Sequence, residues 1–371
     1  MKALKILLLE PFYSGSHKTW ADAIQKYSVN EVELMTLPGR FWKWRMHGAA
    51  MSFAKSITSR DEIWDVILAS DMMDLALLKA LIPAESYRKL AIYFHESQLS
   101  YPRQKDDIDL QEGRDRHYSW INYSSACVAD AVFWNSKFHK EVFLSEIPKY
   151  LNAFPDFIED HSYDVREKSE VLYVGLDLDD MRLPDALDRH GKALILWNHR
   201  WEYDKNPRLF FETLFELKRR GVWFELAVLG EKHKKYPEVF DMAKHKLEEE
   251  IVHWGYVDKR SDYLKWLLKA DILPVTANQE FFGISVLEAV AANTIPLLPR
   301  RLVYPEHFSE EWQQRQFFYE DSKHLVDKLQ RFIMDVKLLR TQKTNHLVTK
   351  YNWKKLIAEY DDQFKRISLK K

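Results

Sequence analysis

Short apolar runs recur along nearly the whole chain, and the stretches between them are long enough for helices. In the first part of the chain the runs cover residues 6–9, 32–35, 66–69, 90–94 and 131–134. The pattern resumes at residues 193–197, 223–229, 251–254, 272–275 and 295–298. Strands that are apolar throughout are typical of parallel sheets, because helices cover both faces of such sheets. The pattern therefore predicts an α/β chain with two doubly wound, Rossmann-like domains.

The length and the spacing of these runs also predict where the domains divide. A chain of 371 residues is long enough for two domains of ordinary size. The charge-rich stretch 160–191 separates the two sets of runs and contains one more predicted strand at 171–175. We expect an N-terminal domain at 1–185, a second domain at 186–345, and a helix at 346–371 that packs back toward the N-terminal domain.

Charge, cysteine content and hydropathy narrow the setting of the protein. Lys plus Arg number 55 against 56 Asp plus Glu, so the whole-chain charge neither demands nor excludes a nucleic-acid partner. Cys127 is the single cysteine, which rules out an intrachain disulfide and a cysteine-based zinc site. The first apolar run meets Glu10 too early for a signal peptide, and no run reaches transmembrane length. We expect a cytoplasmic protein without a membrane partner.

Two glutamates stand eight positions apart, around one glycine, at the start of an apolar helix. Gly283 lets the backbone turn or approach a ligand closely, and Asn293 is suited to end the helix in the left-handed conformation. The helix amides attract an anion, while Glu280 and Glu288 can accept hydrogen bonds from sugar hydroxyls. The segment predicts a nucleotide-sugar site that includes Phe282 and Ile284. The alternative is a buried helix that glutamates happen to flank.

Two cations five positions apart follow the predicted strand at 193–197. Arg200 can chelate phosphate oxygens through its planar guanidinium, and Lys205 can place a point charge on the same group. Such a pair suits a diphosphate, although two ordinary surface cations remain the alternative.

His95 and Glu96 follow the apolar run at 90–94, which predicts a central strand. Ligands of open α/β sheets bind beyond the carboxyl ends of the strands. We therefore expect the His95 imidazole at the ligand edge and assign it a catalytic role, the alternative being a structural histidine.

The first strand-to-helix turn is a short polar loop that contains Gly15, His17 and Lys18. Its spacing matches neither the dinucleotide fingerprint nor the Walker loop, so neither NAD binding nor ATP hydrolysis is predicted. A nucleotide sugar would serve as the donor of a sugar to an acceptor, and we expect the donor mainly in the domain 186–345 and the acceptor mainly in the domain 1–185. We assign Gly15 to the donor site and His17 and Lys18 to the acceptor site. A plain helix-capping turn is the alternative.

Two Asp-x-Asp pairs match a pattern that metal-dependent sugar transferases of another fold use. They are Asp107 with Asp109 and Asp177 with Asp179, and such pairs arise readily in acidic loops. No clustered set of metal ligands accompanies them, so no metal requirement is expected.

Segment 40–47 interleaves aromatic rings with strong cations. Guanidinium groups can bind phosphates, and exposed rings can stack on unpaired bases. We assign Arg40, Trp42, Lys43 and Arg45 to an RNA acceptor. Arg114 and Arg116 could extend this basic rim. The alternative is an amphipathic segment whose tryptophans are buried.

Together, the two Rossmann-like halves, Arg200-x4-Lys205 and Glu280-x7-Glu288 resemble the retaining GT-B glycosyltransferases, in which two such domains face each other across a cleft. The resemblance implies that Arg200 and Lys205 contact the donor diphosphate. It also implies that Glu280 contacts the sugar near the reacting centre and that Glu288 holds the nucleotide ribose. His95 is similar to the histidine of that family near the transferred sugar.

Four segments, 10–18, 37–45, 94–98 and 299–306, look like those of the tRNA-queuosine alpha-mannosyltransferases. The resemblance implies transfer of mannose from GDP-mannose to queuosine in a tRNA anticodon loop, with no tightly bound cofactor and no metal. One alternative is a GT-B enzyme that uses another nucleotide sugar and a polysaccharide or lipid-linked acceptor. Another is a noncatalytic RNA-binding protein on a transferase scaffold.

Overall fold

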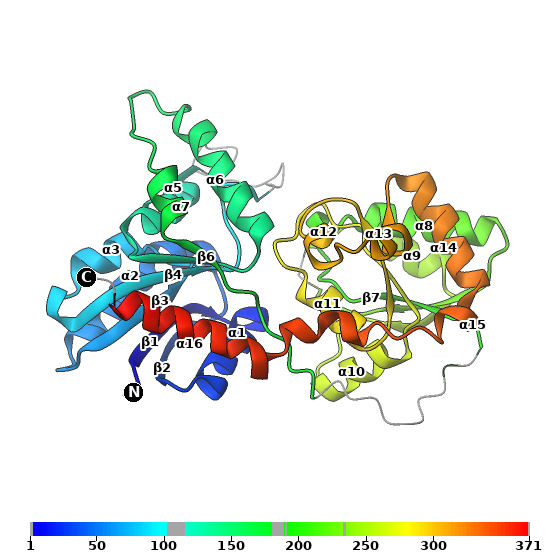
Figure 1. The fold of residues 1–371 in the computed structure, drawn as a ribbon. Helices are drawn as coiled ribbons and strands as arrows, with labels where there is room; N and C mark the ends of the chain where they lie inside the picture. Colours follow the sequence, from blue (N-terminus) through cyan, green and yellow to red (C-terminus); the bar gives the residue numbers. More distant parts are fainter. Residues whose placement is uncertain (1–2, 102–115, 180–188, 190, 233–234, 370–371) are drawn as a thin grey trace. The chain divides into compact units, whose positions relative to one another are not determined.

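The computed structural model describes residues 3–101, 116–179, 189, 191–232 and 235–369. The chain forms two compact units (Figure 1): unit 1 is Met1–Gly175 with Trp353–Lys371, and unit 2 is Leu176–Asn352. The boundary predicted between residues 185 and 186 falls within 180–188, outside the described residues.

Unit 1 contains a parallel, 6-stranded sheet in the order β2-β1-β3-β4-β5-β6. Its strands are β1 (Lys5–Tyr13), β2 (Glu31–Pro38), β3 (Trp64–Ser70), β4 (Tyr87–Phe94), β5 (Ala131–Trp134) and β6 (Ser169–Val171). Its helices are α1 (Gly15–Tyr27), α2 (Trp42–Thr58), α3 (Leu75–Leu81), α5 (Arg116–Val128), α6 (Lys137–Leu151), α7 (Ser162–Glu167) and α16 (Trp353–Leu369), with a 3₁₀ turn, η1 (Ala84–Ser86). The five apolar runs predicted as strands in this part of the chain are all confirmed.

The strand predicted at 171–175 is wrong beyond its first residue, because β6 ends at Val171. The Leu172 amide still donates to the Trp134 carbonyl. The next carbonyl, that of Tyr173, instead accepts from the Tyr360 hydroxyl of α16 at 2.9 Å. The residues after Val171 are apolar because they pack against α16, and no neighbouring strand among the described residues pairs with them, since β5 ends at Trp134.

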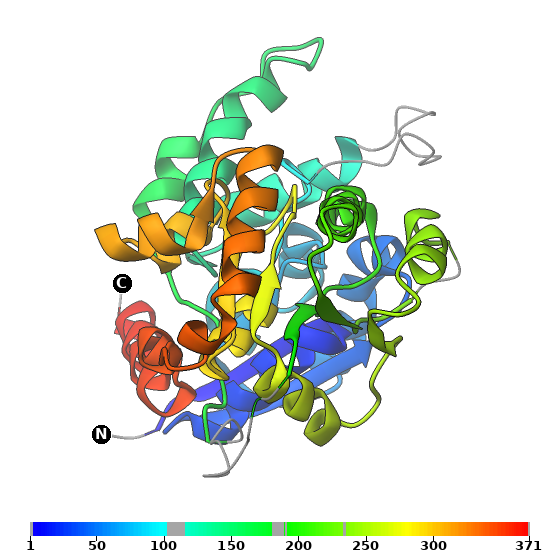
Figure 2. The same cartoon turned by 90° about the vertical axis from the view of Figure 1, so that its right-hand side faces the viewer.

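Alternation along the strands of unit 1 divides its core between the two faces of the sheet. Leu90, Ile92 and Phe94 of β4 belong to a core cluster with α2, α3, α5 and α6. Tyr93 points to the other face, where its ring lies 4.4 Å from Trp20 of α1 and 6.2 Å from Tyr360 of α16. Figure 1 and the turned view in Figure 2 both show α16 beside the N-terminal strands and α1.

Unit 2 contains a second parallel, 6-stranded sheet in the order β12-β11-β10-β7-β8-β9. Its strands are β7 (Ala193–Trp197), β8 (Phe224–Val228), β9 (Ile251–Trp254), β10 (Ile272–Pro274), β11 (Ile295–Pro299) and β12 (Phe318–Tyr319). Its helices are α8 (Pro207–Arg219), α9 (Val239–Lys246), α10 (Arg260–Lys269), α11 (Ile284–Ala291), α12 (Tyr304–His307), α13 (Glu311–Phe317), α14 (Ser322–Met334) and α15 (Val336–Leu339), with 3₁₀ turns η2 (Tyr203–Lys205) and η3 (Asn345–Tyr351). In Figure 1, α8, α9 and α14 lie on one side of this sheet and α10 and α11 on the other.

The predicted doubly wound α/β architecture with two Rossmann-like domains is confirmed. The sequence did not predict β12, a two-residue edge strand too short to leave an apolar pattern. In each sheet the chain first winds in one direction from the starting strand and then returns to its other side. This reversal places a switch point between β1 and β3 in unit 1 and between β7 and β10 in unit 2. Ligands of open α/β sheets bind beyond the strand ends at such points.

Candidate active site

Lys205 and Glu280 meet at the switch point of the unit 2 sheet. Lys205 lies in η2 after β7, and Glu280 lies in the loop after β10. The Lys205 ammonium is 3.1 Å from Glu280 Oε2, 3.1 Å from Asp204 Oδ2 and 3.1 Å from the Gln279 carbonyl oxygen. The sequence separated these residues by more than seventy positions, and the fold joins them in one ion-pair network.

Electrostatics keep this pair charged although it is largely buried. Burial by itself would lower the pKa of Lys205, but the nearby Glu280 and Asp204 carboxylates outweigh it and raise that pKa. Burial would raise the pKa of Glu280, yet the Lys205 ammonium holds it below its ordinary value. An ammonium and a carboxylate in direct contact therefore persist across the neutral range.

Local backbone geometry positions the Lys205 side. Asn206 adopts a left-handed conformation, with φ 51°, and its side chain accepts from the Leu209 amide to cap α8. The Thr276 hydroxyl donates to the Lys205 carbonyl at 2.9 Å and ties η2 to the segment after β10. Gly230 has φ +100°, and a Cβ there would lie 1.9 Å from the His199 carbonyl oxygen. Only glycine allows this close approach of the chains after β7 and β8.

The Glu280 loop turns into α11 as predicted. Gly283 caps the helix with φ 81°, and Glu280 Oε1 accepts from the Phe282 amide at 3.4 Å. Ile284 is the first helical residue. Asn293 has φ 61°, so the left-handed helix end predicted from the sequence is confirmed.

Glu288 contacts two side chains that the sequence did not indicate. Glu288 Oε1 lies 2.6 Å from the Arg260 guanidinium, and Glu288 Oε2 accepts from the Tyr263 hydroxyl at 2.9 Å. Both partners belong to α10, and no spacing in the sequence relates them to Glu288. The Arg260 side chain is 47 % exposed, so its ion pair with Glu288 contributes little to stability. A ligand hydroxyl could displace it at low cost.

Several buried polar atoms near this network lack a hydrogen-bond partner among the described residues. They are Asn198 Oδ1, His199 Nε2 and the Tyr304 hydroxyl. Burial, together with the Lys205 charge, lowers the pKa of His199 to about 4, so its imidazole is neutral at pH 7. Buried polar atoms are normally satisfied, which makes these atoms candidates for hydrogen bonds to a hydroxylated ligand.

Arg200 lies on the exposed side of this network. Its side chain is 49 % exposed and lies 3.5 Å from Glu202. Its positive charge acts against the carboxylates by lowering the pKa of Lys205, although the net shift of that pKa is upward. The predicted pair of cations thus consists of one buried ammonium, held by carboxylates, and one accessible guanidinium.

The switch point of the unit 1 sheet brings together Glu10, His17, Asp71 and His95. His17 Nδ1 lies 3.2 Å from Glu10 Oε1, and the rings of His17 and His95 are 4.0 Å apart between centroids. Asp71 Oδ1 accepts from the His95 amide at 2.8 Å. The sequence predicted His95 and His17 for the site but missed Glu10 and Asp71. Their positions at or just after strands β1 and β3 were the available signal.

The remaining residues of the first turn point elsewhere. Lys18 is exposed, bonds to Asp22 and lies 3.1 Å from the Tyr13 hydroxyl, whereas His17 is buried. Gly15 has φ +51° and open space around it. His17 therefore faces the interior of unit 1, whereas its neighbour Lys18 faces solvent.

The predicted RNA segment, 40–47, leads into α2 and is only partly exposed. Phe41 is 69 % exposed and Trp44 is 75 % exposed, whereas Trp42 is partly buried, with its ring 5.2 Å from that of Tyr118. The Arg45 guanidinium donates to the Pro38 carbonyl. The rings available for stacking are therefore those of Phe41 and Trp44, and the assignment of Trp42 remains a prediction.

Other polar side chains belong to this segment or to α5. Arg40 is exposed, and Lys43 places its ammonium 5.7 Å from the Trp42 ring centroid. His47 of α2 stacks on His117 of α5, with the two rings 4.8 Å apart. Arg116 is exposed and reaches the Ala153 carbonyl, whereas Arg114 lies outside the described residues.

Two groups of residues have the chemistry of metal ligands. Glu10, His17 and His95 bring potential ligand atoms within 4.8 Å of one another. A proton on His17 already neutralises the Glu10 carboxylate, so this group does not require an ion. Asp177 and Asp179 belong to no cluster of ligands within the described ranges, and Asp107 and Asp109 fall in 102–115, which those ranges omit.

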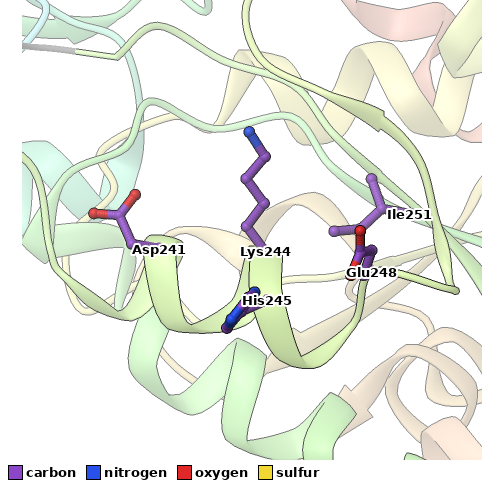
Figure 3. Close-up of a pocket in the computed structure, with 5 residues that line it drawn as sticks. All are labelled: Asp241, Lys244, His245, Glu248 and Ile251. Atoms are coloured by element: carbon purple, nitrogen blue, oxygen red, sulfur yellow. The ribbon is translucent and has the colours of Figure 1, made fainter.

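A surface depression on α9 is unrelated to these sites. Figure 3 shows Asp241, Lys244 and His245 on the helix, with Glu248 and Ile251 after it. Ile251 begins β9, so the depression lies at the amino end of that strand. Ligands of such sheets bind at the opposite, carboxyl ends.

None of the described helices combines the length and apolar character needed to cross a membrane.

Comparison with known families divides the chain much as the two units do. Residues 5–176 match the family model described as tRNA-queuosine alpha-mannosyltransferase N-terminal, and residues 183–347 match glycosyl transferases group 1.

Known proteins are similar to nearly the whole chain. The tRNA-queuosine alpha-mannosyltransferase of Drosophila melanogaster is 35 % identical over 377 aligned residues, which cover 97 % of this chain and 96 % of that protein. Sucrose-phosphate synthase from Thermosynechococcus elongatus has a TM-score of 0.70 at 14 % identity, covering 98 % and 99 % of the two chains. The Anabaena protein HepE, in complex with UDP and glucose, gives 0.69 at 12 % identity, covering 98 % and 100 %. The solved structures support the GT-B type of fold.

Proposed function

We propose, because this chain belongs to the tRNA-queuosine alpha-mannosyltransferase family, that it transfers mannose from GDP-mannose to queuosine in a tRNA anticodon loop. The observation that carries the proposal is the Lys205–Glu280 pair at the switch point of the unit 2 sheet. A fixed cation beside a fixed carboxylate is suited to a substrate that joins a phosphate to a sugar.

In this proposal unit 2 binds the donor. Arg200 and Lys205 contact the diphosphate, and Glu280 contacts the mannose near its reacting carbon. Glu288 holds the ribose, whose hydroxyls displace the Arg260 guanidinium. Gly283, Phe282 and Ile284 form the loop and helix start that face the donor. Gly15, assigned to the donor site from the sequence, is a further donor contact in the proposal.

The charged side chains of the site act on the charges that develop during the reaction. As GDP leaves, negative charge develops on its phosphate, and the Lys205 ammonium and the Arg200 guanidinium stabilise that charge without reorganising. The leaving phosphate takes the proton of the attacking hydroxyl on the same face of the sugar, and the α configuration is retained. Glu280, already a carboxylate, stabilises positive charge at the reacting carbon, and His95 of unit 1 orients the attacking hydroxyl of the acceptor. We expect this chemistry to need no metal and no bound cofactor.

Unit 1 binds the acceptor in the proposal. Arg40 and Lys43 attract phosphates, while the exposed Phe41 and Trp44 offer faces for unpaired bases, the mode by which proteins usually read RNA loops. Trp42 and Arg45 support this surface through their contacts with Tyr118 and Pro38. His17 and Lys18 reach the modified nucleoside. A tRNA substrate is consistent with a cytoplasmic location.

The test is to incubate the full chain with GDP-mannose and queuosine-containing tRNA, without added metal, and to weigh the digested nucleosides by mass spectrometry. A hexose on queuosine is the expected result. Glu280→Gln should abolish transfer while tRNA binding persists. The matched control is Glu212→Gln, because Glu212 is 57 % exposed in a weak pair with Arg208 of the same unit. An unchanged nucleoside despite donor binding would reject the acceptor assignment, and transfer by Glu280→Gln at the wild-type rate would reject the proposed site.

A further inference from the structure

A buried group at the switch point of the unit 1 sheet offers more than the separate contacts assigned above. Glu10 comes from β1, His17 from α1, and His95 from the residue after β4. The exposed fractions are 0 % for Glu10, 8 % for His17 and 8 % for His95. Three polar side chains are thus enclosed where the fold places ligands.

Glu10 acts on His17 and has no exposed surface for a ligand. Its Oε1 also accepts from the Phe12 amide at 2.8 Å, which orients the carboxylate. His17 Nδ1 lies 3.2 Å and 3.3 Å from the two Glu10 oxygens and must donate its hydrogen to them. The Nε2 edge of the His17 ring therefore remains for another partner.

The charge of His17 follows from its neighbours. Burial by itself would lower the pKa of His17, but the Glu10 carboxylate, with smaller contributions from Asp71 and Glu96, raises it to about 9. His17 is accordingly an imidazolium at neutral pH, and both of its ring nitrogens are donors.

His95 is the opposite kind of histidine. Burial, reinforced by the His17 charge, lowers the pKa of His95 well below its ordinary value, so the ring is neutral. The rings of Trp20 and Tyr93 hold it at centroid distances of 4.7 Å and 4.8 Å. Its Nε2 is buried and has no hydrogen-bond partner in the part of the chain that the structure describes. An enclosed, rigidly held ring with an unsatisfied nitrogen indicates that a ligand completes it.

We propose that His17 and His95 together bind a vicinal diol, that Glu10 is the residue that positions His17, and that the diol is the cyclopentenediol of the acceptor nucleoside. The identity of the diol rests on the proposed function. The imidazolium of His17 donates to one hydroxyl oxygen. The neutral His95 exchanges a hydrogen bond with the second hydroxyl, and the 4.0 Å ring separation lets one small ligand reach both. Two histidines in different protonation states thus match two adjacent hydroxyls.

The binding experiment uses the wild-type full chain and two free bases: queuine, and its analogue with a plain aminomethyl group in place of the cyclopentenediol unit. NMR of the histidine Cε1–H groups reports the contact, with assignments from His17→Gln and His95→Gln. We expect queuine to shift both resonances and the analogue to shift neither. Equal shifts with both bases, or with neither, would overturn the proposal.

The kinetic experiment uses Glu10→Gln. Without the carboxylate His17 loses its charge at lower pH, so kcat/KM for queuosine-containing tRNA should fall at least tenfold at pH 8. The midpoint of its decline at high pH should move from about 9 to lower pH, while GDP-mannose binding to unit 2 is unchanged. Glu33→Gln is the matched control, because Glu33 pairs with Arg60 on the surface of the same unit. A profile of Glu10→Gln that coincides with that of Glu33→Gln would reject the positioning role.

Other outcomes separate this inference from the proposed function. Queuine binding without hexose transfer would reject the function and leave the diol site standing, whereas transfer with no effect of Glu10→Gln or His17→Gln would do the reverse. If Glu10→Gln fails to fold, His17→Gln and the NMR titration decide. Tight binding of Zn²⁺ or Mn²⁺ that is lost in His95→Gln and required for transfer would make the group a metal site and overturn the diol assignment.

Discussion

Replacing Lys205 with methionine should destabilise unit 2 strongly. Lys205 is 8 % exposed, and its ammonium is 3.1 Å from both the Glu280 and the Asp204 carboxylates. Methionine has a similar length and fills the same space, so the loss is electrostatic. Two carboxylates then face each other in a largely buried site without a cation.

The magnitude follows from that uncompensated charge. Removing one partner of a buried ion pair costs about 3–5 kcal/mol, because the desolvated charge that remains has lost its counterion. With a urea m-value of roughly 1–3 kcal/mol/M, the unfolding midpoint of unit 2 falls by about 1 M or more. Part of the loss should be relieved in the double variant Lys205→Met, Glu280→Gln, in which only the Asp204 carboxylate remains uncompensated.

Hydrogen exchange of the full chain in increasing urea, read by mass spectrometry, measures the two units separately. Peptides of unit 1 are the internal reference, because two units need not unfold in one step. The matched control is Lys265→Met. Lys265 is 66 % exposed in a pair with Asp262, and its loss should cost no more than about 1 kcal/mol.

A loss below about 1 kcal/mol in unit 2 would refute this reasoning. It would mean that water or a side-chain rearrangement compensates the two carboxylates. Failure of the double variant to recover any stability would show that Glu280 is not the residue that Lys205 neutralises.

The remaining predictions concern the backbone, the RNA surface and pH. Gly230→Ala should destabilise unit 2 by at least about 2 kcal/mol in urea unfolding, because its Cβ has no space and its φ disfavours a side chain; wild-type stability would refute the close approach. Trp44→Ala should weaken tRNA binding by about 1–3 kcal/mol, the worth of one stacked base, in a filter-binding titration. Trp223→Ala, at a similarly exposed position in unit 2, should leave it unchanged. The Lys205–Glu280 pair should stabilise unit 2 fully between the unfolded pKa values of 4.5 and 10.5. The contribution of Glu280 is lost as the pH falls from 4.5 through its lowered folded pKa, and that of Lys205 as the pH rises from 10.5 through its raised folded pKa. A flat profile of unfolding free energy against pH would contradict this prediction.

The sequence by itself determined the architecture and half of each candidate site. Apolar runs report strands that are buried on both faces, and this signal survives without tertiary information because it depends on local composition. The same holds for the left-handed Asn293, whose side chain tolerates that conformation, and for His95, which follows a strongly apolar strand. Resemblance at Glu280 and Lys205 indicated the side of the chain to which we assign the donor.

Only the tertiary structure decided which side chains meet. Arg260 reaches Glu288 because α10 packs beside α11, and Glu10 reaches His17 because α1 folds back on β1. The exposure of individual side chains could not be predicted from the sequence either. The pattern of segment 40–47 does not tell which tryptophan is exposed; in the structure Trp42 is partly buried against Tyr118, whereas Trp44 lies in solvent. Hydrogen bonds, ion pairs and burial depend on distances across the fold, whereas strand patterns depend on neighbours along the chain.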